Sequence, residues 1–248
     1  MTKYISNLSS ISYIFPVYNE YERLPNLFEN LGRISSKKKI KREIIFVDDG
    51  SKDKSKSLIS SFIKKNKNKN ISYKLFSYNK NKGKGFAIKK GVLKSKYVWI
   101  LTLDCDLSVN LNQIDIWLKK KFISKKQNYA YFGSRSLPNS EVDALWIRKL
   151  LGFFFRILEK LIISSGLEDT QCGYKLYNKI YAKKIFKKMS IDGFVHDIAL
   201  IYLLKKHSIK IKELPVKWIH KAGSKINIII EPFKMIFVLL KIKKIFAN

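Results

Sequence analysis

The stretch YVWILTLDCDLS, residues 97–108, joins a continuous apolar run to two aspartates that flank a cysteine. A short apolar run that ends in Asp is typical of a buried strand followed by a turn, because Asp side chains hydrogen-bond nearby backbone. Carboxylates at alternate positions of an extended strand end also project to the same side and suit a divalent cation. The motif alone therefore allows two interpretations, a structural turn and a metal site.

Similar apolar runs recur before and after this stretch. They are short, rich in β-branched or aromatic residues and bounded by turn residues, which predicts strands. The predicted strands cover residues 11–15, 43–47, 73–76, 97–103 and 129–132, and amphipathic segments of helical length cover residues 19–31, 54–65, 85–94 and 112–122. This alternation predicts an α/β fold with a mostly parallel central sheet flanked by helices.

Polar segments follow three of the predicted strands. PVYNE (16–20) follows the first strand, DDGS (48–51) the second and DCD (104–106) the fourth. Because an open α/β sheet binds ligands at the carboxyl ends of its strands, we expect the three segments to meet at one edge. Three converging acidic turns indicate a binding site better than any one of them does.

The second half of the chain is predicted to be more helical. Helices are expected over residues 143–164, 178–189 and 194–206, a strand over 209–216, and an apolar-faced helix at the C-terminus. No linker rich in Gly, Ser or Pro divides the 248 residues, so we predict a single domain over residues 1–248.

The chain is strongly basic, with 50 Lys and Arg against 19 Asp and Glu and a formal net charge of +31. Such a charge attracts nucleic acid, anionic lipid or phosphorylated substrates, although the abundance of Lys, Asn and Ile also fits compositional drift. Cys105 and Cys172 form no CxxC pair and the N-terminus has no apolar signal segment, which favours a reducing cytosolic setting without disulfides or zinc. No uninterrupted apolar stretch reaches the roughly 18 residues that indicate a membrane-spanning helix.

Taken together, these segments resemble glycosyltransferase family 2, the inverting nucleotide-sugar enzymes of the GT-A fold. The resemblance is carried by PVYNE (16–20), VDDGSKD (47–53), NKGKGFAIKKGV (81–92) and LTLDCDLS (101–108). It is narrowed to the dolichyl-phosphate β-glucosyltransferase and polyprenyl-phosphate glycosyltransferase branch by FGSR (132–135), DTQCGYKLY (169–177), PVKW (215–218) and GSK (223–225). The resemblance implies inverting transfer of a hexose, with glucose from UDP-glucose favoured, to a polyprenyl or dolichyl phosphate.

The resemblance places the nucleotide-sugar donor in about residues 1–135. A divalent cation, Mg²⁺ or Mn²⁺, would bridge the two phosphates and stabilise the departing nucleoside diphosphate. Asp106 would be the direct metal ligand, and Asp104 would face the ribose or reach the metal through water. The other residues implied in donor binding are Tyr18 beside the base, Pro16 and Glu20 at the ribose, Asp49 accepting a hydrogen bond from the base, and Lys82 and Lys84 near the diphosphate. Asp48 is equally well interpreted as a turn former.

The acceptor would bind about residues 136–248 together with Arg135. A lipid-linked phosphate is largely ionised at neutral pH, so it needs cationic positioning more than a general base. By resemblance Arg135 and Arg148 would hold this phosphate, because a guanidinium binds phosphate oxygens in a fixed fork. A solvated surface arginine is the alternative interpretation of each.

A family 2 enzyme that acts on a glycan hydroxyl is the main alternative, because a hydroxyl acceptor needs a base. Asp169 is the best candidate for that base. In the lipid-phosphate branch its motif would instead orient the donor sugar or the loop that carries Arg148, with Gln171 as a sugar contact. FVHD (194–197) takes the place of the FDxE-type segment of the family, which leaves Asp197 and puts Ala199 where glutamate is usual.

Ser108 bears on the sugar. Mannosyl-phosphate relatives often carry DADxQ, and this chain has DCDLS, so mannosyl transfer from GDP-mannose becomes a less favoured alternative. A basic nucleic-acid-binding module is the non-enzyme alternative, although no nucleic-acid partner is expected.

The amphipathic segment over residues 150–163 and the basic C-terminus fit either a core helix or a helix in a bilayer surface. We therefore expect a cytoplasmic enzyme that associates peripherally with the cytoplasmic face of a membrane.

Overall fold

The computed structural model describes residues 5, 8–35, 40–66, 71–124, 126, 128–143, 166–193, 195–221, 236–237, 240–242 and 244–246. Most of the helix predicted over residues 143–164, with Arg148 in it, lies outside the described residues, as does most of the C-terminal helix.

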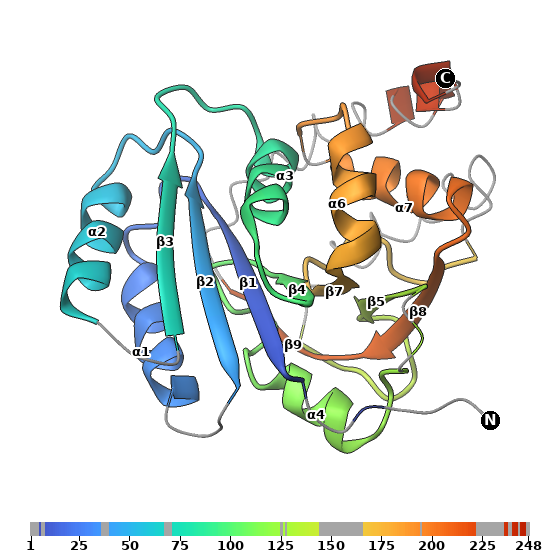
Figure 1. Cartoon of the computed structure of the whole chain (residues 1–248), viewed down its shortest axis with the longest axis horizontal. Helices are drawn as coiled ribbons and strands as arrows, with labels where there is room; N and C mark the ends of the chain where they lie inside the picture. Colours follow the sequence, from blue (N-terminus) through green and yellow to red (C-terminus); the bar gives the residue numbers. More distant parts are fainter. Residues whose placement is uncertain are drawn as a thin grey trace.

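A seven-stranded sheet forms the centre of the described structure, in the order β3-β2-β1-β4-β7-β5-β8 (Figure 1). Its strands are β1 (Ser10–Val17), β2 (Lys41–Asp48), β3 (Ile71–Ser77), β4 (Trp99–Thr102), β5 (Tyr129–Ser134), β7 (Lys175–Asn178) and β8 (Lys210–Pro215). Neighbouring strands are parallel except around β7, which runs antiparallel to both β4 and β5. The predicted α/β fold with a mostly parallel sheet is confirmed.

Helices cover both faces of this sheet. One face packs against α1 (Leu24–Ser35), α2 (Ser55–Lys65) and α4 (Gln113–Lys119), and the other against α3 (Lys84–Lys94), α6 (Lys179–Lys188) and α7 (His196–Lys206). The neighbouring β1 residues Ile14 and Phe15 are fully buried in opposite clusters, because successive strand side chains point to opposite faces. Burial on both faces explains why β1 is mostly apolar, with two buried serines, rather than alternating.

The prediction places the start of the first helix too early. Residues 19–23 form a turn instead, and α1 begins at Leu24. Asn19 has a φ of 54°, and its side-chain Oδ1 accepts the amide of Lys52 at 2.7 Å. An Asn side chain that bonds distant backbone competes with helix formation, which accounts for the late start.

Three short strands are absent from the prediction. β6 (Glu141–Asp143) pairs in parallel with β9 (Lys217–Ile219), so Asp143 belongs to a strand and does not begin a helix. β7 lies in the middle of the sheet, yet its first residue is a lysine. Lys175 is buried against the carboxylate of Asp197, and a charged residue at a core position hides the apolar pattern of a strand.

Candidate active site

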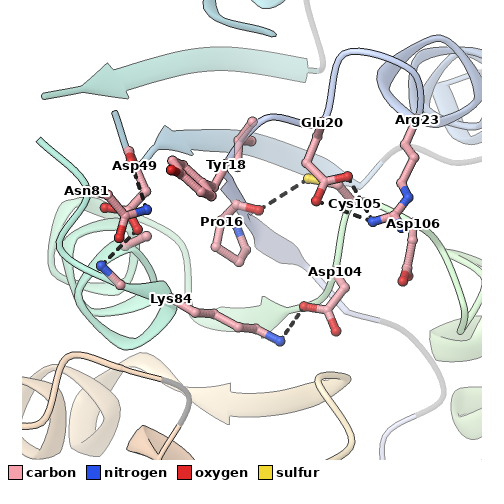
Figure 2. Close-up of a pocket in the computed structure, with 13 residues that line it drawn as sticks. Pro16, Tyr18, Glu20, Arg23, Asp49, Asn81, Lys84, Asp104, Cys105 and Asp106 are labelled. Atoms are coloured by element: carbon pink, nitrogen blue, oxygen red, sulfur yellow. Dashed lines mark hydrogen bonds and ion pairs between the residues drawn. The ribbon is translucent and has the colours of Figure 1, made fainter. Parts of the chain in front are cut away.

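A cavity of about 250 Å³ lies where β1, β2 and β4 end, as the convergence of the three acidic turns predicts (Figure 2). Of the predicted donor-site and metal residues, it is lined by Pro16, Tyr18, Glu20, Asp49, Lys84, Asp104 and Asp106. Asp48 and Gln171 are not among its lining residues. Three segments that are distant in the sequence thus form one site.

Hydrogen bonds connect the turn after β1 to the segment after β2. The amide of Asn19 donates to Ser51 Oγ at 2.9 Å, and the amide of Glu20 donates to Ser55 Oγ at 2.8 Å. Asp48, which is buried, accepts the amide of Ser51 at 3.2 Å. This bond favours the interpretation of Asp48 as a turn former and holds one wall of the cavity rigidly.

Asp49 connects the end of β2 to the glycine-rich loop before α3. Its Oδ1 accepts the amide of Lys82 at 2.7 Å, and its Oδ2 accepts the amide of Gly83 at 2.8 Å. Gly83 has a φ of 99°, a conformation that favours glycine. Asp49 therefore positions the loop that carries Lys84, and any contact of Asp49 with the nucleoside would use the remaining lone pairs of its oxygens.

Lys84, in the first turn of α3, reaches across the cavity to Asp104. Its Nζ lies 2.6 Å from Asp104 Oδ1 (Figure 2). Burial alone would lower the pKa of Lys84, but the charges of Asp104 and Asp197 outweigh it and raise that pKa. The ammonium therefore stays charged inside the cavity.

Asp104 and Asp106 lie in a turn rather than on extended backbone. β4 ends at Thr102, and the amide of Leu107, whose φ is 53°, donates to the carbonyl of Asp104 at 3.3 Å. The expectation that an extended strand end aligns the two carboxylates is therefore wrong. Figure 2 shows the Asp104 carboxylate directed at Lys84 and the Asp106 side chain on the Arg23 side of the cavity.

The carboxylates still fit a divalent cation. Asp106 Oδ1 accepts the amide of Ser108 at 2.8 Å, which fixes the side chain and leaves lone pairs on both oxygens. Among the described residues, no group of three or more His, Cys, Asp or Glu side chains could enclose a metal. Mg²⁺ commonly takes one or two protein carboxylates and completes its shell with phosphate and water, so this sparse set suits a metal that arrives with a diphosphate.

Gly173 forms the wall behind Asp104. A Cβ at Gly173 would lie 2.4 Å from Asp104 Oδ2, so any larger residue would require the carboxylate to move from this position. Among the residues that sequence reasoning missed, Gly173 acts on Asp104 most directly. The position of Gly173 in the DTQCGYKLY motif could have marked it in the sequence, but only the fold shows that it lies against Asp104.

Arg135 and Asp169 form a two-pronged ion pair. Arg135 donates from Nε to Asp169 Oδ2 at 2.6 Å and from Nη2 to Oδ1 at 2.8 Å, and its amide also donates to Oδ2 at 2.9 Å. Burial alone would raise the pKa of Asp169, but the charge and hydrogen bonds of Arg135 and the amide of Gln171 lower it to about 2. A carboxylate this acidic is a weak base toward a sugar hydroxyl.

The remaining predicted residues lie in different places. The backbone amide of Gln171 donates to Asp169 Oδ1 at 3.1 Å, so Gln171 lies next to the ion pair rather than in the cavity. Asp197 is buried with Lys175 and His196, and Ala199 is buried in the core of α7. Cys105 is buried with its Sγ 3.3 Å from the carbonyl of Pro16, and burial raises its thiol pKa well above the ordinary value. That thiol is not poised for chemistry.

Comparison with known proteins decides the family. The model of the family described as Glycosyl transferase family 2 matches residues 12–186. The chain belongs to glycosyl transferase family 2. The matched range contains every residue that lines the cavity, as well as Arg135 and Asp169.

Two relatives of this family 2 glycosyltransferase share a name. A dolichyl-phosphate beta-glucosyltransferase from Dictyostelium discoideum is 33% identical over 228 residues, which cover 88% of this chain and 68% of the relative. A human protein of the same name is 30% identical over 238 residues, which cover 89% of this chain and 71% of the relative.

A solved structure shares the fold of this family 2 glycosyltransferase. The glucosyl-3-phosphoglycerate synthase from Mycobacterium tuberculosis in complex with Mn²⁺, UDP-glucose and phosphoglyceric acid has a TM-score of 0.64. It is 13% identical, and the match covers 94% of this chain and 79% of that chain. In the described part of the present chain, no helix is both long and apolar enough to span a bilayer.

Proposed function

We propose that this chain transfers glucose from UDP-glucose to the phosphate of a polyprenyl lipid such as dolichyl phosphate, with inversion at the anomeric carbon. The observation that carries the proposal is the pairing of Asp169 with Arg135 at the acceptor side of the site. The best candidate for a hydroxyl-activating base is thereby bound to a cation. An acceptor that is already ionised needs no such base.

On the donor side, the 250 Å³ cavity would hold UDP-glucose. Tyr18, which is 37% exposed, would lie beside the uracil, and Pro16 and Glu20 would border the ribose. Asp106 would bind Mg²⁺ or Mn²⁺ directly, with Asp104 as its partner. A bound cation would supply charge stabilisation to the departing diphosphate.

Lys84 would add a second positive charge at the diphosphate. Its Nζ contacts Asp104, and Lys84 itself lies in the first turn of α3, where the positive end of the helix dipole also favours anions. Support for a nucleotide-sugar donor with a divalent metal comes from the Mycobacterium tuberculosis synthase of the same fold, whose structure holds UDP-glucose and Mn²⁺.

On the acceptor side, Arg135 would orient the lipid phosphate, together with Arg148, which lies outside the described residues. Two of the guanidinium nitrogens of Arg135 bind Asp169, and its side chain is one-third exposed, so an outer edge can still donate. A phosphate oxygen would attack the anomeric carbon as the bond from that carbon to UDP breaks on the opposite face. In this proposal the donor binds about residues 1–135, and the acceptor binds mainly about residues 136–248.

The acceptor also suggests where the enzyme works. The net charge of +31 favours contact with anionic lipid head groups, and exposed apolar residues Phe237 and Leu240 lie near Lys241 in the described part of the C-terminus. We propose peripheral association with the cytoplasmic face of a membrane.

Two enzymatic alternatives are separated by one experiment. The protein is incubated with Mn²⁺ or Mg²⁺, dolichyl phosphate and either UDP-glucose, other UDP-sugars or GDP-mannose, and lipid products are identified by mass spectrometry. We expect a hexosyl phospholipid from UDP-glucose. A lipid product formed only with GDP-mannose would show that the proposed donor is wrong. Transfer only to added glycan hydroxyls would show that the proposed acceptor is wrong.

A further inference from the structure

A buried charged cluster lies next to the donor cavity and is unused in the proposed reaction. Lys175, His196 and Asp197 are 1%, 2% and 5% exposed. Lys175 Nζ donates to the Asp197 carboxylate and to the carbonyl of Thr170 at 3.1 Å. His196 Nε2 lies 3.3 Å from Asp197 Oδ1.

Stability is a weak reason for such a cluster. Desolvation of two charges offsets most of their attraction, so well-packed apolar residues in place of a buried ion pair often leave stability unchanged. The elements that Lys175 and Asp197 connect suggest a different role. Lys175 begins β7, and Asp197 is in the first turn of α7.

The Lys175 end of the pair lies close to the wall behind Asp104. Thr102 Oγ1, at the end of β4, donates to the carbonyls of Gly173 at 3.3 Å and Lys175 at 3.4 Å. Gly173, two residues before Lys175, lies directly against the Asp104 carboxylate, because a Cβ there would be 2.4 Å from Oδ2. A displacement of β7 would therefore move the surface that positions Asp104.

The Asp197 end lies next to the first turn of α3. The carbonyl of Asp192 accepts the amide of Phe86 at 3.0 Å, and a Cβ on Gly85 would lie 2.5 Å from the Cβ of His196. The segment that leads into α7 and the first turn of α3 are thus in close contact. That turn carries Lys84, whose Nζ contacts Asp104.

We propose that Lys175 and Asp197 are positioning residues: their buried ion pair sets the spacing between Asp104 and Lys84, and with it the affinity for a divalent cation and a nucleoside diphosphate. The inference rests on the donor site of the proposed function and deepens it. Neither residue lines the cavity. Each acts through the element that carries a contact residue, β7 through Gly173 and α7 through the first turn of α3.

The main test removes both charges at once with the double variant Lys175→Met/Asp197→Leu, which leaves no unpaired buried charge. Its thermal unfolding is compared with that of the wild type, UDP binding in the presence of Mn²⁺ is measured by calorimetry, and Mn²⁺ binding by electron paramagnetic resonance. We expect a folded protein whose dissociation constants for Mn²⁺ and for UDP with Mn²⁺ rise about tenfold, the usual effect of losing a residue that orients a metal ligand.

A matched control is Lys74→Met. Lys74 pairs with the buried Glu43 at 2.7 Å on β2 and β3, and neither residue lines the cavity. This variant also breaks a pair with a buried carboxylate, and it should bind UDP and Mn²⁺ as the wild type does.

A folded double variant with wild-type affinities would overturn the proposal. If the double variant does not fold, Asp197→Asn, which is nearly isosteric, is tested in the same way. Failure of both variants to fold would assign the pair to stability alone and also overturn the proposal. A wild type that binds UDP with Mn²⁺ yet glucosylates no lipid phosphate would refute the proposed function without touching this inference.

Discussion

Arg135 donates hydrogen bonds to both carboxylate oxygens of Asp169, from Nε at 2.6 Å and from Nη2 at 2.8 Å. The pair joins the FGSR and DTQC motifs, which are 34 residues apart in the sequence. Asp169, the candidate base, instead holds the guanidinium of Arg135 in place. A fixed guanidinium is the arrangement that an anionic acceptor needs.

The first prediction concerns the pH dependence of stability. The pKa of Asp169 falls from 3.8 to about 2 on folding, so the unfolded state binds the proton more tightly. The stabilisation is therefore fully present above about pH 4 and is lost as the pH falls toward 2. At pH 7, Asp169→Asn should lower the free energy of unfolding by about 2 kcal/mol. Urea unfolding at pH 7 and pH 3 measures this difference, which should shrink at pH 3; a difference independent of pH would contradict the assigned pairing.

The second prediction concerns acceptor recognition. Arg135→Lys keeps the positive charge but removes the planar fork, so the KM for dolichyl phosphate should rise about tenfold while the affinity for UDP is unchanged. Steady-state kinetics with each substrate varied measure this split. Lys217→Ala is the control, because its ion pair with Glu141 is exposed and should matter little. An equal loss in donor and acceptor binding would argue against an acceptor role for Arg135.

The third prediction concerns the space around Asp104. A methyl group at residue 173 would lie 2.4 Å from Asp104 Oδ2, so Gly173→Ala should displace the carboxylate and weaken Mn²⁺ binding at least tenfold. Gly32→Ala is the matched control, because a Cβ on Gly32 in α1 meets nothing within 4 Å. It should leave metal affinity unchanged and raise stability by up to about 1 kcal/mol. Calorimetric titration with Mn²⁺ and UDP distinguishes the two variants, and unchanged binding in Gly173→Ala would count against Asp104 as part of the metal site.

The fourth prediction concerns the metal itself. Removal of divalent cations with EDTA should abolish glucosyl transfer, and added Mn²⁺ or Mg²⁺ should restore it. Asp106→Asn should lower turnover at least a hundredfold, on the order of 3 kcal/mol in the activation barrier. Glu29→Gln, a change of an exposed carboxylate on α1, is the control. Full activity in EDTA would contradict a metal role for Asp104 and Asp106.

Much of the fold follows from the sequence. The buried parallel strands β1 and β2 each contain a largely apolar run that ends at turn residues, so their positions and their common edge could be predicted. β7 could not, because the buried Lys175 is stabilised by Asp197, a contact between residues 22 apart that no local pattern shows. The start of α1 was misplaced for a related reason, since the Asn19 side chain bonds the backbone of Lys52.

The candidate site divides in the same way. The motifs predicted which turns would meet, and the cavity brings Tyr18, Asp49 and Asp104 together. The motifs did not predict the hydrogen-bond and ion-pair partners of these side chains. Asp49 accepts two loop amides, and Asp104 pairs with Lys84, because these partners depend on how the loops cross in space. The roles of these residues toward donor and metal remain predictions for the experiments above.

The most direct test of the central claim compares two acceptors that differ only at the reacting end. The protein is incubated with Mn²⁺ and UDP-glucose labelled in the glucose, together with either a polyprenyl phosphate or the corresponding polyprenyl alcohol, and the anomeric configuration of the labelled lipid is determined by NMR. We predict a β-linked glucosyl phosphate from the lipid phosphate and no product from the alcohol. Glucosylation of the alcohol, or an α-linked product from the phosphate, would contradict the proposed reaction.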